Sequence, residues 1–224
     1  MMMTDYSAAR LNMVETQVRP NGITDRRIIS AVERVPRERF VPESRRAVAY
    51  MDEDVPLDPA DKASGPRALI EVMAFARMLQ HAQIKPAEKL LLVGAGTGYG
   101  ASVAAGLAQR VVALECDAGL ALAARRNLEG TANVTLVEGP LAAGVPAEQP
   151  FDVILAEGRV GDVPEAWINQ LADGGRLVAV VGETEMAQAC VYTRAGGAVA
   201  VRQVFDASVA ALPGLKKKKP AFVF

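Results

Sequence analysis

The chain has few residues of the kinds that build metal sites, disulfide frameworks or membrane spans. Its 224 residues include one histidine, His81, and two cysteines, Cys116 and Cys190, which lie far apart. A single imidazole argues against a Ser-His-Asp triad and against most metal sites, so we expect no bound metal. Two distant cysteines argue against a disulfide framework and favour a reduced, cytoplasmic setting. No run of about 18 apolar residues predicts a membrane span, and the N-terminus lacks the basic-then-apolar layout of a signal peptide.

Neither sign of charge dominates the chain. The formal net charge is −1, with 23% charged and 50% hydrophobic residues. A balance this even predicts no nucleic-acid partner and no membrane partner, and the lysine run at 216–219 is interpreted as a solvated tail. The length suffices for one good-sized α/β domain, and the sequence carries no signal for an oligomeric state.

What the sequence does contain is a strand, a glycine turn and a helix in succession over residues 89–108. Leu90–Val93 is a wholly apolar run, typical of a parallel strand covered on both faces. Gly94, Gly96 and Gly98 follow, and the small residues after them predict a helix that packs closely on the sheet. Glycines let the backbone bend beside a ligand, and a helix N-terminus offers free N–H groups. This stretch is therefore the predicted ligand-binding turn.

Two registers describe the spacing of these glycines. Counted from Gly94 it is G-x-G-x-G, the usual pattern of class I S-adenosylmethionine-dependent methyltransferases. Counted from Gly96 it is G-x-G-x-x-A, ending at Ala101, which fits the dinucleotide fingerprint of a nicotinamide dehydrogenase loosely. We prefer the first register because it puts the first glycine directly after the strand.

Strands and helices alternate from Leu90 onward, which is typical of a doubly wound parallel sheet. Near the end, two strands flank Ala195-Gly196-Gly197, which predicts an antiparallel hairpin. The predicted fold is therefore α/β, a Rossmann-like, mostly parallel seven-stranded sheet with a C-terminal antiparallel hairpin. The expected strands cover 90–93, 110–115, 134–137, 151–156, 176–181, 187–194 and 198–205, with helices at 118–129 and 165–171.

Residues 1–80 are predicted to form an N-terminal helical and loop extension, and residues 81–224 the core, together one globular domain. The segment 50–62 is acidic and contains prolines, which predicts a loop. Three helices are expected in this extension. The first covers 5–20, and the second runs from an N-cap at Thr24 or Asp25 to Val35. The third has Pro66 in its first turn and ends at about Gln80.

Acidic residues stand at the carboxyl ends of three successive predicted strands. Glu115 ends the strand at 110–115, Glu138 and Gly139 follow the next, and Glu157 follows the one after. Adjacent parallel strands bring these ends to one crevice, where Glu115 is expected to accept hydrogen bonds from both ribose hydroxyls of an adenosyl ligand. The predicted cofactor-binding residues are Gly94, Ala95, Gly96, Gly98, Glu115, Cys116, Glu138 and Gly139.

Motifs spread over nearly the whole chain carry a family resemblance. Val35-Pro-Arg-Glu-Arg-Phe-Val-Pro42 matches V-P-R-E-x-F-V-P, and Ala49-Tyr50-Met-Asp52 matches A-Y-x-D. Ala63-Ser64-Gly65-Pro66 falls where T-I-S-x-P is usual. Further matches are Met13 to Asp25, Gly94 to Tyr99 and Gln170 to Val178. These segments resemble the protein-L-isoaspartate (D-aspartate) O-methyltransferases.

The resemblance implies a class I fold and methyl transfer from S-adenosylmethionine to the α-carboxyl of isoaspartyl residues in damaged proteins or peptides. A carboxylate is already ionised near neutral pH, so this reaction needs no general base and suits a chain with one histidine. In the family the serine of T-I-S-x-P is the usual active-site residue, which carries the catalytic role over to Ser64. The alternative for Ser64 is a helix N-cap ahead of Pro66.

Three positions depart from the family pattern. Leu92 stands where the family commonly has glutamate, and Pro140 where it has an aspartate that contacts adenine. Ala156-Glu157-Gly158-Arg159 replaces its A-A-A-P. Three functions therefore stay open: the isoaspartyl methyltransferase, a diverged methyltransferase acting on another carboxylate or hydroxyl, and a non-catalytic protein that keeps the fold for binding.

Overall fold

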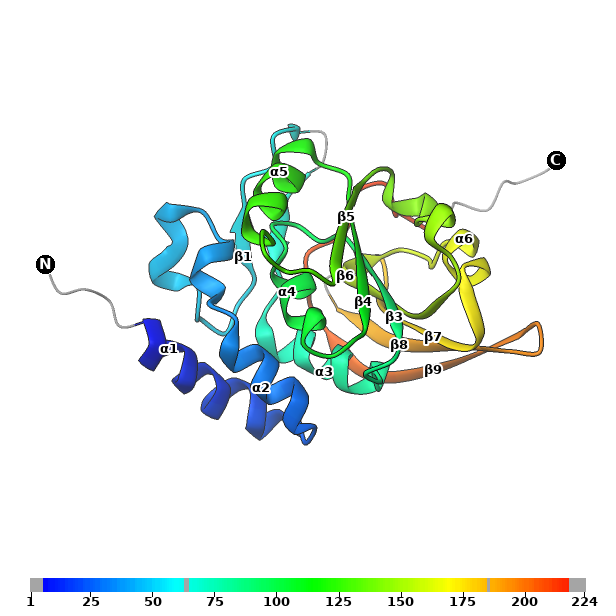
Figure 1. Ribbon diagram of the computed structural model, residues 1–224, viewed down its shortest axis with the longest axis horizontal. Helices are drawn as coiled ribbons and strands as arrows, with labels where there is room; N and C mark the ends of the chain where they lie inside the picture. The colour runs from blue at the N-terminus through cyan, green and yellow to red at the C-terminus, as the bar shows by residue number, and fades with distance from the viewer. Residues whose placement is uncertain (1–5, 63–64, 185, 218–224) are drawn as a thin grey trace, which may run out of the picture.

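The computed structural model describes residues 6–62, 65–184 and 186–217. Its centre is a seven-stranded sheet in the order β5-β4-β3-β6-β7-β8-β9 (Figure 1), and β1 and β2 form a separate antiparallel pair. The strands are β1 Val55–Leu57, β2 Arg67–Leu69, β3 Lys89–Val93, β4 Arg110–Glu115, β5 Val134–Glu138, β6 Phe151–Val160, β7 Leu171–Val181, β8 Ala187–Ala195 and β9 Ala198–Ala207.

The strands from β5 to β7 run parallel, and β8 and β9 are antiparallel additions at one edge. This arrangement confirms the predicted α/β fold and its C-terminal hairpin. β3 lies between β4 and β6, with Val93 level with both Leu114 and Ala156. The carboxyl ends of these three strands therefore lie side by side at one end of the sheet, directly beside the glycine turn.

Alternate side chains of β3 enter two separate cores. Leu90 and Leu92 pack with the N-terminal helices, α3 and α4, whereas Leu91 and Val93 pack with Trp167 of α6. The side chains of Leu90, Leu91, Leu92 and Val93 are all fully buried, as a strand covered on both faces requires. The helices are α1 Tyr6–Met13, α2 Arg26–Arg34, α3 Val72–Ala82, α4 Tyr99–Ala105, α5 Ala118–Asn127 and α6 Glu165–Asn169.

The N-terminal extension packs on one side of the sheet, where Figure 1 shows it in blue. The predicted cap of α2 is confirmed: Asp25 accepts a hydrogen bond from the Arg27 N–H at 2.8 Å. The fully buried Arg37 ties the extension to the start of α3, donating to the carbonyls of Ala49 and Ile70 at 2.8 Å each. Among the described residues, no helix has the length and apolar character needed to cross a membrane.

Several predicted element boundaries are wrong. The segment 50–62, predicted as a loop, contains β1, and the strand predicted to end at 156 continues to Val160. Pro66 does not begin a helix, because residues 67–69 form β2 and α3 begins only at Val72. Arg67 and Leu69 are buried on either side of a less buried residue, which is the alternation of a strand rather than a helix. The helix predicted at 165–171 is also too long: α6 ends at Asn169 and β7 begins at Leu171, because Leu171 pairs with Phe151 of β6. A β-bulge then separates this pair from the pair of Val153 with Arg176.

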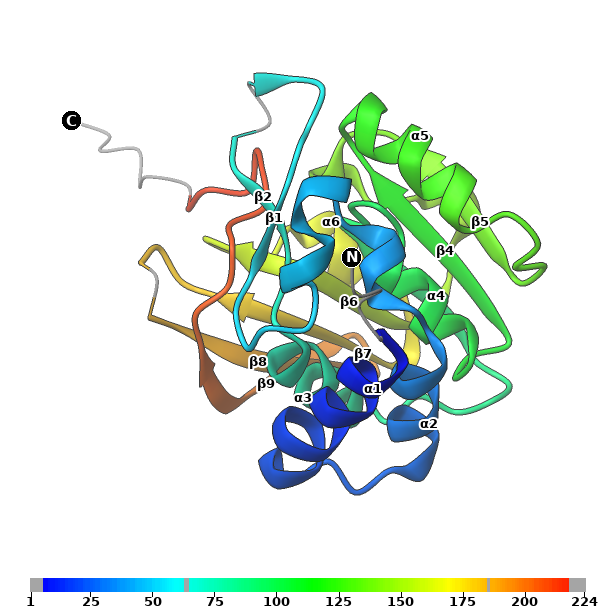
Figure 2. The ribbon, with the colours of Figure 1, turned by 90° about the vertical axis from the view of Figure 1, so that its left-hand side faces the viewer.

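The chain after β9 runs back along the end of β6 as a strap, residues 209–215, beside β1 and β2 (Figure 2). The Arg159 N–H donates to Ala210 O at 2.9 Å, and the Leu212 N–H donates to Arg159 O at 2.8 Å. The Leu212 side chain lies over Gly158 and Gly94, because a methyl group on these glycines would be 2.8 Å and 2.5 Å from it, respectively. The strap therefore covers the first glycine of the turn.

Replacing Gly158 with valine is expected to lower the free energy of unfolding by about 2–4 kcal/mol. Gly158 has a φ of +149°, and its new Cβ would lie 2.8 Å from Leu212, so backbone strain and overpacking add. Urea denaturation followed by circular dichroism measures the change. Gly130→Val is the matched control, since Gly130 has a φ of +83° but nothing within 4 Å. Equal losses in the two variants would contradict close packing of the strap on β6.

Candidate active site

The turn between β3 and α4 has the backbone conformation that glycine adopts most readily. The φ angle is +82° at Gly94, +54° at Gly96 and +96° at Gly98. The N–H groups of Gly94 and Ala95 donate to Leu114 O at 2.9 and 3.0 Å, which docks the turn on the end of β4. The glycine turn thus lies against the strand that carries the predicted acid.

Glu115 at the end of β4 is fully buried and accepts five hydrogen bonds from described residues. Arg67 of β2 holds both carboxylate oxygens, with Nη1–Oε1 at 2.6 Å and Nη2–Oε2 at 2.7 Å. The N–H groups of Gly96, Cys116 and Asp117 donate the other three, at 2.7 to 3.0 Å. Burial by itself raises the pKa of Glu115, but the hydrogen bonds and charge of Arg67 outweigh it and hold the pKa below its ordinary value. Glu115 is therefore ionised and its oxygens are saturated.

Side chains of the protein itself fill the crevice at the strand ends. A methyl group on Gly94 would lie 2.5 Å from Leu212, and one on Gly96 would lie 3.1 Å from Leu57. The Arg67 guanidinium lies beside them, with Nη2 3.5 Å from Gly94 O. The backbone expected of a cofactor cradle is present, and these three side chains occupy its space.

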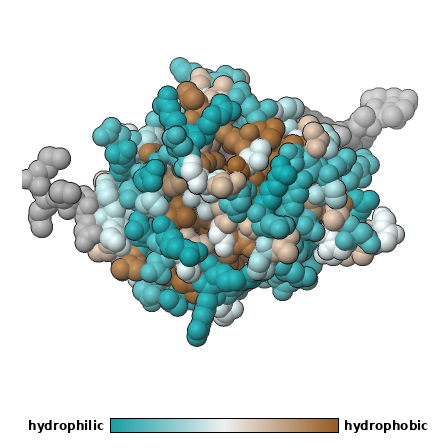
Figure 3. All heavy atoms as spheres, viewed as in Figure 1, coloured by the Kyte–Doolittle hydropathy of each residue, from teal (hydrophilic) through white to brown (hydrophobic). Residues whose placement is uncertain are grey.

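The remaining predicted residues are spread over the same edge of the sheet. The Gly139 N–H donates to Glu115 O at 2.9 Å, whereas the Glu138 side chain is exposed at the end of β5. Burial raises the pKa of the Cys116 thiol to about 11, so this thiol stays protonated. Ser64 lies outside the described residues. Figure 3 shows apolar side chains gathered over the region of β5 on a largely hydrophilic face.

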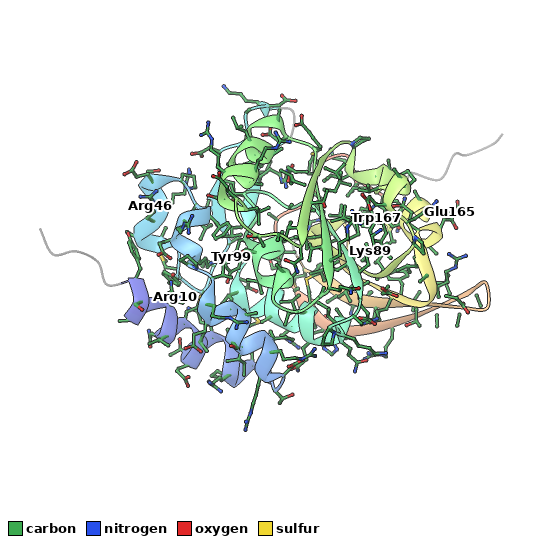
Figure 4. The ribbon with its side chains drawn as sticks, viewed as in Figure 1. Arg10, Arg46, Lys89, Tyr99, Glu165 and Trp167 are labelled. Atoms are coloured by element: carbon green, nitrogen blue, oxygen red, sulfur yellow. The ribbon has the colours of Figure 1, made fainter. Side chains whose placement is uncertain are left out.

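Glu157 is a second buried acid at this edge. It lies within β6, directly after Ala156 and three residues before the end of the strand at Val160. Glu157 is 5% exposed, and its Oε2 has no hydrogen-bond partner among the described residues. Burial raises the pKa of Glu157 to about 8, so the carboxyl is mostly protonated at neutral pH. The buried Tyr99 and Arg37 face it, and Figure 4 shows Tyr99 between α4 and the N-terminal elements. The sequence placed Glu157 at the crevice without indicating its protonation state.

Arg67 is the site residue that sequence reasoning missed. The segment was assigned to the first turn of a helix, where an arginine is expected on the surface. The one local signal was the alternation of Arg67, Ala68 and Leu69, which is too short to establish a strand without knowledge of its partner. The side chain reaches Glu115 because the pairing of β2 with β1 places Arg67 beside the carboxyl end of β4.

The arrangement offers one ionised acid, one neutral acid and one guanidinium in a closed crevice. It provides carboxyl oxygens that can accept hydrogen bonds from hydroxyl groups, but it contains no imidazole. His81 stacks on Phe205 with ring centroids 5.7 Å apart and lies with Arg176 at the opposite end of the strands. The described residues contain no cluster of three His, Cys, Asp or Glu side chains that could hold a metal ion. This chemistry suits binding and alignment of a ligand rather than proton transfer by a histidine.

Comparison with known proteins identifies relatives over almost the whole chain. The model of the protein-L-isoaspartate(D-aspartate) O-methyltransferase family matches residues 9–217. The protein-L-isoaspartate O-methyltransferase of Koribacter versatilis is 37% identical over 221 residues, 98% of this chain and 97% of the relative. That of Methylorubrum populi is 42% identical over 181 residues, 80% of this chain and 82% of the relative.

Two solved structures share the fold. A protein-L-isoaspartate O-methyltransferase superposes with a TM-score of 0.79 at 24% identity, covering 92% of this chain and 67% of the other. A putative protein-L-isoaspartate O-methyltransferase from Plasmodium falciparum, in complex with S-adenosyl-L-homocysteine, superposes with a TM-score of 0.76 at 19% identity. That match covers 91% of this chain and 97% of the other.

Glu115→Ala is expected to lower the free energy of unfolding by about 3–5 kcal/mol, because it leaves the Arg67 guanidinium buried without a counter-ion. Chemical denaturation measures this loss. Glu15→Ala is the matched control, because Glu15 pairs with Arg19 at 2.8 Å but is 61% exposed, and its loss is expected to stay below about 0.5 kcal/mol. If Glu115→Ala cost no more than the control, Arg67 would not be held inside the crevice.

Proposed function

Since this chain belongs to the protein-L-isoaspartate(D-aspartate) O-methyltransferase family, we propose that it methylates the α-carboxylate of L-isoaspartyl residues in damaged proteins. The observation that carries this function is the glycine turn at the end of β3 beside Glu115 at the end of β4, set within a match over residues 9–217. A match of this length favours protein repair over another methyl acceptor or a non-catalytic role. Both cysteines are free, which supports a cytoplasmic setting.

The backbone of the crevice fits S-adenosylmethionine, which supplies an electrophilic methyl group when bound. The turn glycines have no Cβ atoms to obstruct a ligand, and Glu115 is an ionised acceptor suited to ribose hydroxyls. Binding requires Arg67, Leu57 and Leu212 to move aside, because they occupy the cradle. The residues proposed to hold the cofactor are Gly94, Ala95, Gly96, Gly98, Glu115, Cys116, Glu138 and Gly139.

Catalysis in this crevice is proposed to rest on alignment and exclusion of water. The acceptor carboxylate is ionised near neutral pH and needs no base, in keeping with a site that lacks an imidazole. Leu57 and Leu212 are apolar, and once they have moved aside for the cofactor they are proposed to exclude water from the rim of the crevice. A dry site that holds the attacking oxygen in line with the methyl group supplies much of the rate.

The segment around Ser64 is proposed to receive the substrate. Gly65 and Pro66, which follow Ser64 in the chain, line a cavity of about 440 Å³ together with Arg159 and the strap. This cavity opens beside the end of β6, next to the cofactor crevice. We assign to the Ser64 hydroxyl a hydrogen bond to the substrate carboxylate.

Transfer of radiolabelled methyl groups from S-adenosylmethionine tests the function directly. A peptide containing one L-isoaspartyl residue is expected to be methylated, and the same peptide with ordinary aspartate at least about tenfold more slowly. The aspartyl peptide is the matched control, since the two differ only in which carboxyl enters the main chain. Equal labelling of both peptides would contradict isoaspartyl specificity, and labelling of neither would contradict the activity.

Ser64→Ala is expected to lower turnover of the isoaspartyl peptide about tenfold, because one hydrogen bond to the substrate is lost. Affinity for S-adenosylhomocysteine should stay unchanged, since Ser64 is not among the residues proposed to hold the cofactor. Steady-state kinetics and calorimetry measure the two quantities. Ser30→Ala on α2 serves as control, and unchanged turnover in both variants would remove Ser64 from the site.

A further inference from the structure

Arg67 lies between two buried acids that are in different states. It forms a two-pronged ion pair with Glu115, with side chains 3% and 0% exposed. Glu157 also acts electrostatically on the Arg67 guanidinium, and two cations act on Glu157, first Arg37 and then Arg67. Arg37 is held in place by the carbonyls of Ala49 and Ile70, although its Nη1 has no hydrogen-bond partner among the described residues. The Arg67 guanidinium is therefore paired with Glu115, and Glu157 is a second acid close enough to interact with it but not paired with it.

Glu157 occupies a space that a glycine leaves open. Its Oε2 lies against Gly100 in the first turn of α4, where a methyl group would clash with it. The charged and titratable groups that face Glu157 are Arg37 after α2, Arg67 of β2, Tyr99 of α4 and Glu115 of β4. None of them makes a hydrogen bond to Glu157 Oε2 among the described residues, so this oxygen can still accept one.

Occupation of the crevice by an adenosyl ligand conflicts with the Arg67–Glu115 pair. A carboxylate has about four lone-pair sites, and Glu115 already accepts five hydrogen bonds, two of them from Arg67. Ribose hydroxyls can bind Glu115 only if the guanidinium leaves. A guanidinium that leaves one buried acid needs another counter-ion, since an unpaired buried charge costs several kcal/mol.

We propose that ligand binding moves the Arg67 guanidinium from Glu115 to Glu157, so that Glu157 is the receiving residue that positions Arg67 while Glu115 holds the ribose. This inference rests on the proposed function. The O–H bond of the Glu157 carboxyl breaks, its proton passes to solvent, and the resulting carboxylate pairs with Arg67. Glu115 stays ionised after the exchange, because the N–H groups of Gly96, Cys116 and Asp117 and the ribose hydroxyls donate to it in place of Arg67. The two acids and the arginine thereby gain one negative charge, which complements the sulfonium of S-adenosylmethionine.

The protonation state of Glu157 makes the exchange measurable. Burial raises its pKa to about 8, so the group enters the exchange mostly protonated at pH 7 and leaves it ionised. Binding at pH 7 should therefore release close to one proton per ligand. The release should fall toward zero at pH 9, above the pKa, because Glu157 is then ionised before the ligand arrives.

Calorimetric titration of the full chain with S-adenosylhomocysteine, in phosphate and in Tris at pH 7, measures the released protons from the difference in heat. The wild type is expected to release about one proton per ligand bound. Glu157→Gln keeps the shape of the neutral acid, so it should fold and bind without releasing a proton, about tenfold more weakly because Arg67 loses its receiving partner. Arg67→Met should also bind without release, and it provides a second test if Glu157→Gln does not fold.

Glu88→Gln is the matched control. Glu88 pairs with Arg176 at 2.7 Å and is largely buried, but this pair lies at the opposite edge of the sheet, so proton release should persist. Binding with the same heat in both buffers overturns the exchange and leaves the proposed function intact. Proton release that survives in Glu157→Gln also overturns it. Absence of any binding, in the wild type and in every variant, overturns the proposed function and the exchange with it.

Discussion

The buried ion pair between Arg67 and Glu115 is the interaction on which the site depends. The Glu115 carboxylate collects N–H groups from the glycine turn at Gly96 and from Asp117, where α5 begins. Asp117 in turn caps α5 by accepting a hydrogen bond from the Leu120 N–H at 2.9 Å. The guanidinium and three backbone N–H groups, those of Gly96, Cys116 and Asp117, together keep the carboxylate ionised in the interior. One buried pair thus joins β2, the end of β4, the glycine turn and α5.

The strap gives a structural role to the segment after Ala156, where the sequence departs from the family pattern. Gly158 near the end of β6 leaves room for Leu212. The N–H and the carbonyl of Arg159 both form hydrogen bonds to the strap, at Ala210 and Leu212, respectively. Asp54 fastens the strap from the opposite direction, accepting hydrogen bonds from the N–H groups of Ala210 and Glu71 at 2.8 Å each. The residues after Ala156 therefore serve to dock the end of the chain, and the same docking places Leu212 on the glycine turn.

Most of the fold follows from local patterns in the sequence. The apolar runs of β3 and β4, the glycines between β3 and α4, and the caps at Asp25 and Asp117 are signals contained within a few residues. Parallel strands buried on both faces and turns with positive φ allow few residue types, so these positions could be predicted. β2 could not, because three residues gain their stability from pairing with β1 and from burial rather than from their own propensity.

The sequence by itself determined the order of strands and helices from β3 onward, the position of the glycine turn, and the presence of an acid at the end of β4. Only the tertiary structure decided what that acid binds, because its partner Arg67 is 48 residues away in the chain and arrives on a strand that has no strong local signal. The tertiary structure likewise decided that Glu157 is neutral and Glu115 is ionised. Both are buried glutamates on neighbouring parts of the sheet, Glu115 at the end of β4 and Glu157 within β6. Their charge depends on burial and on the groups packed around them, which are properties of the packed interior.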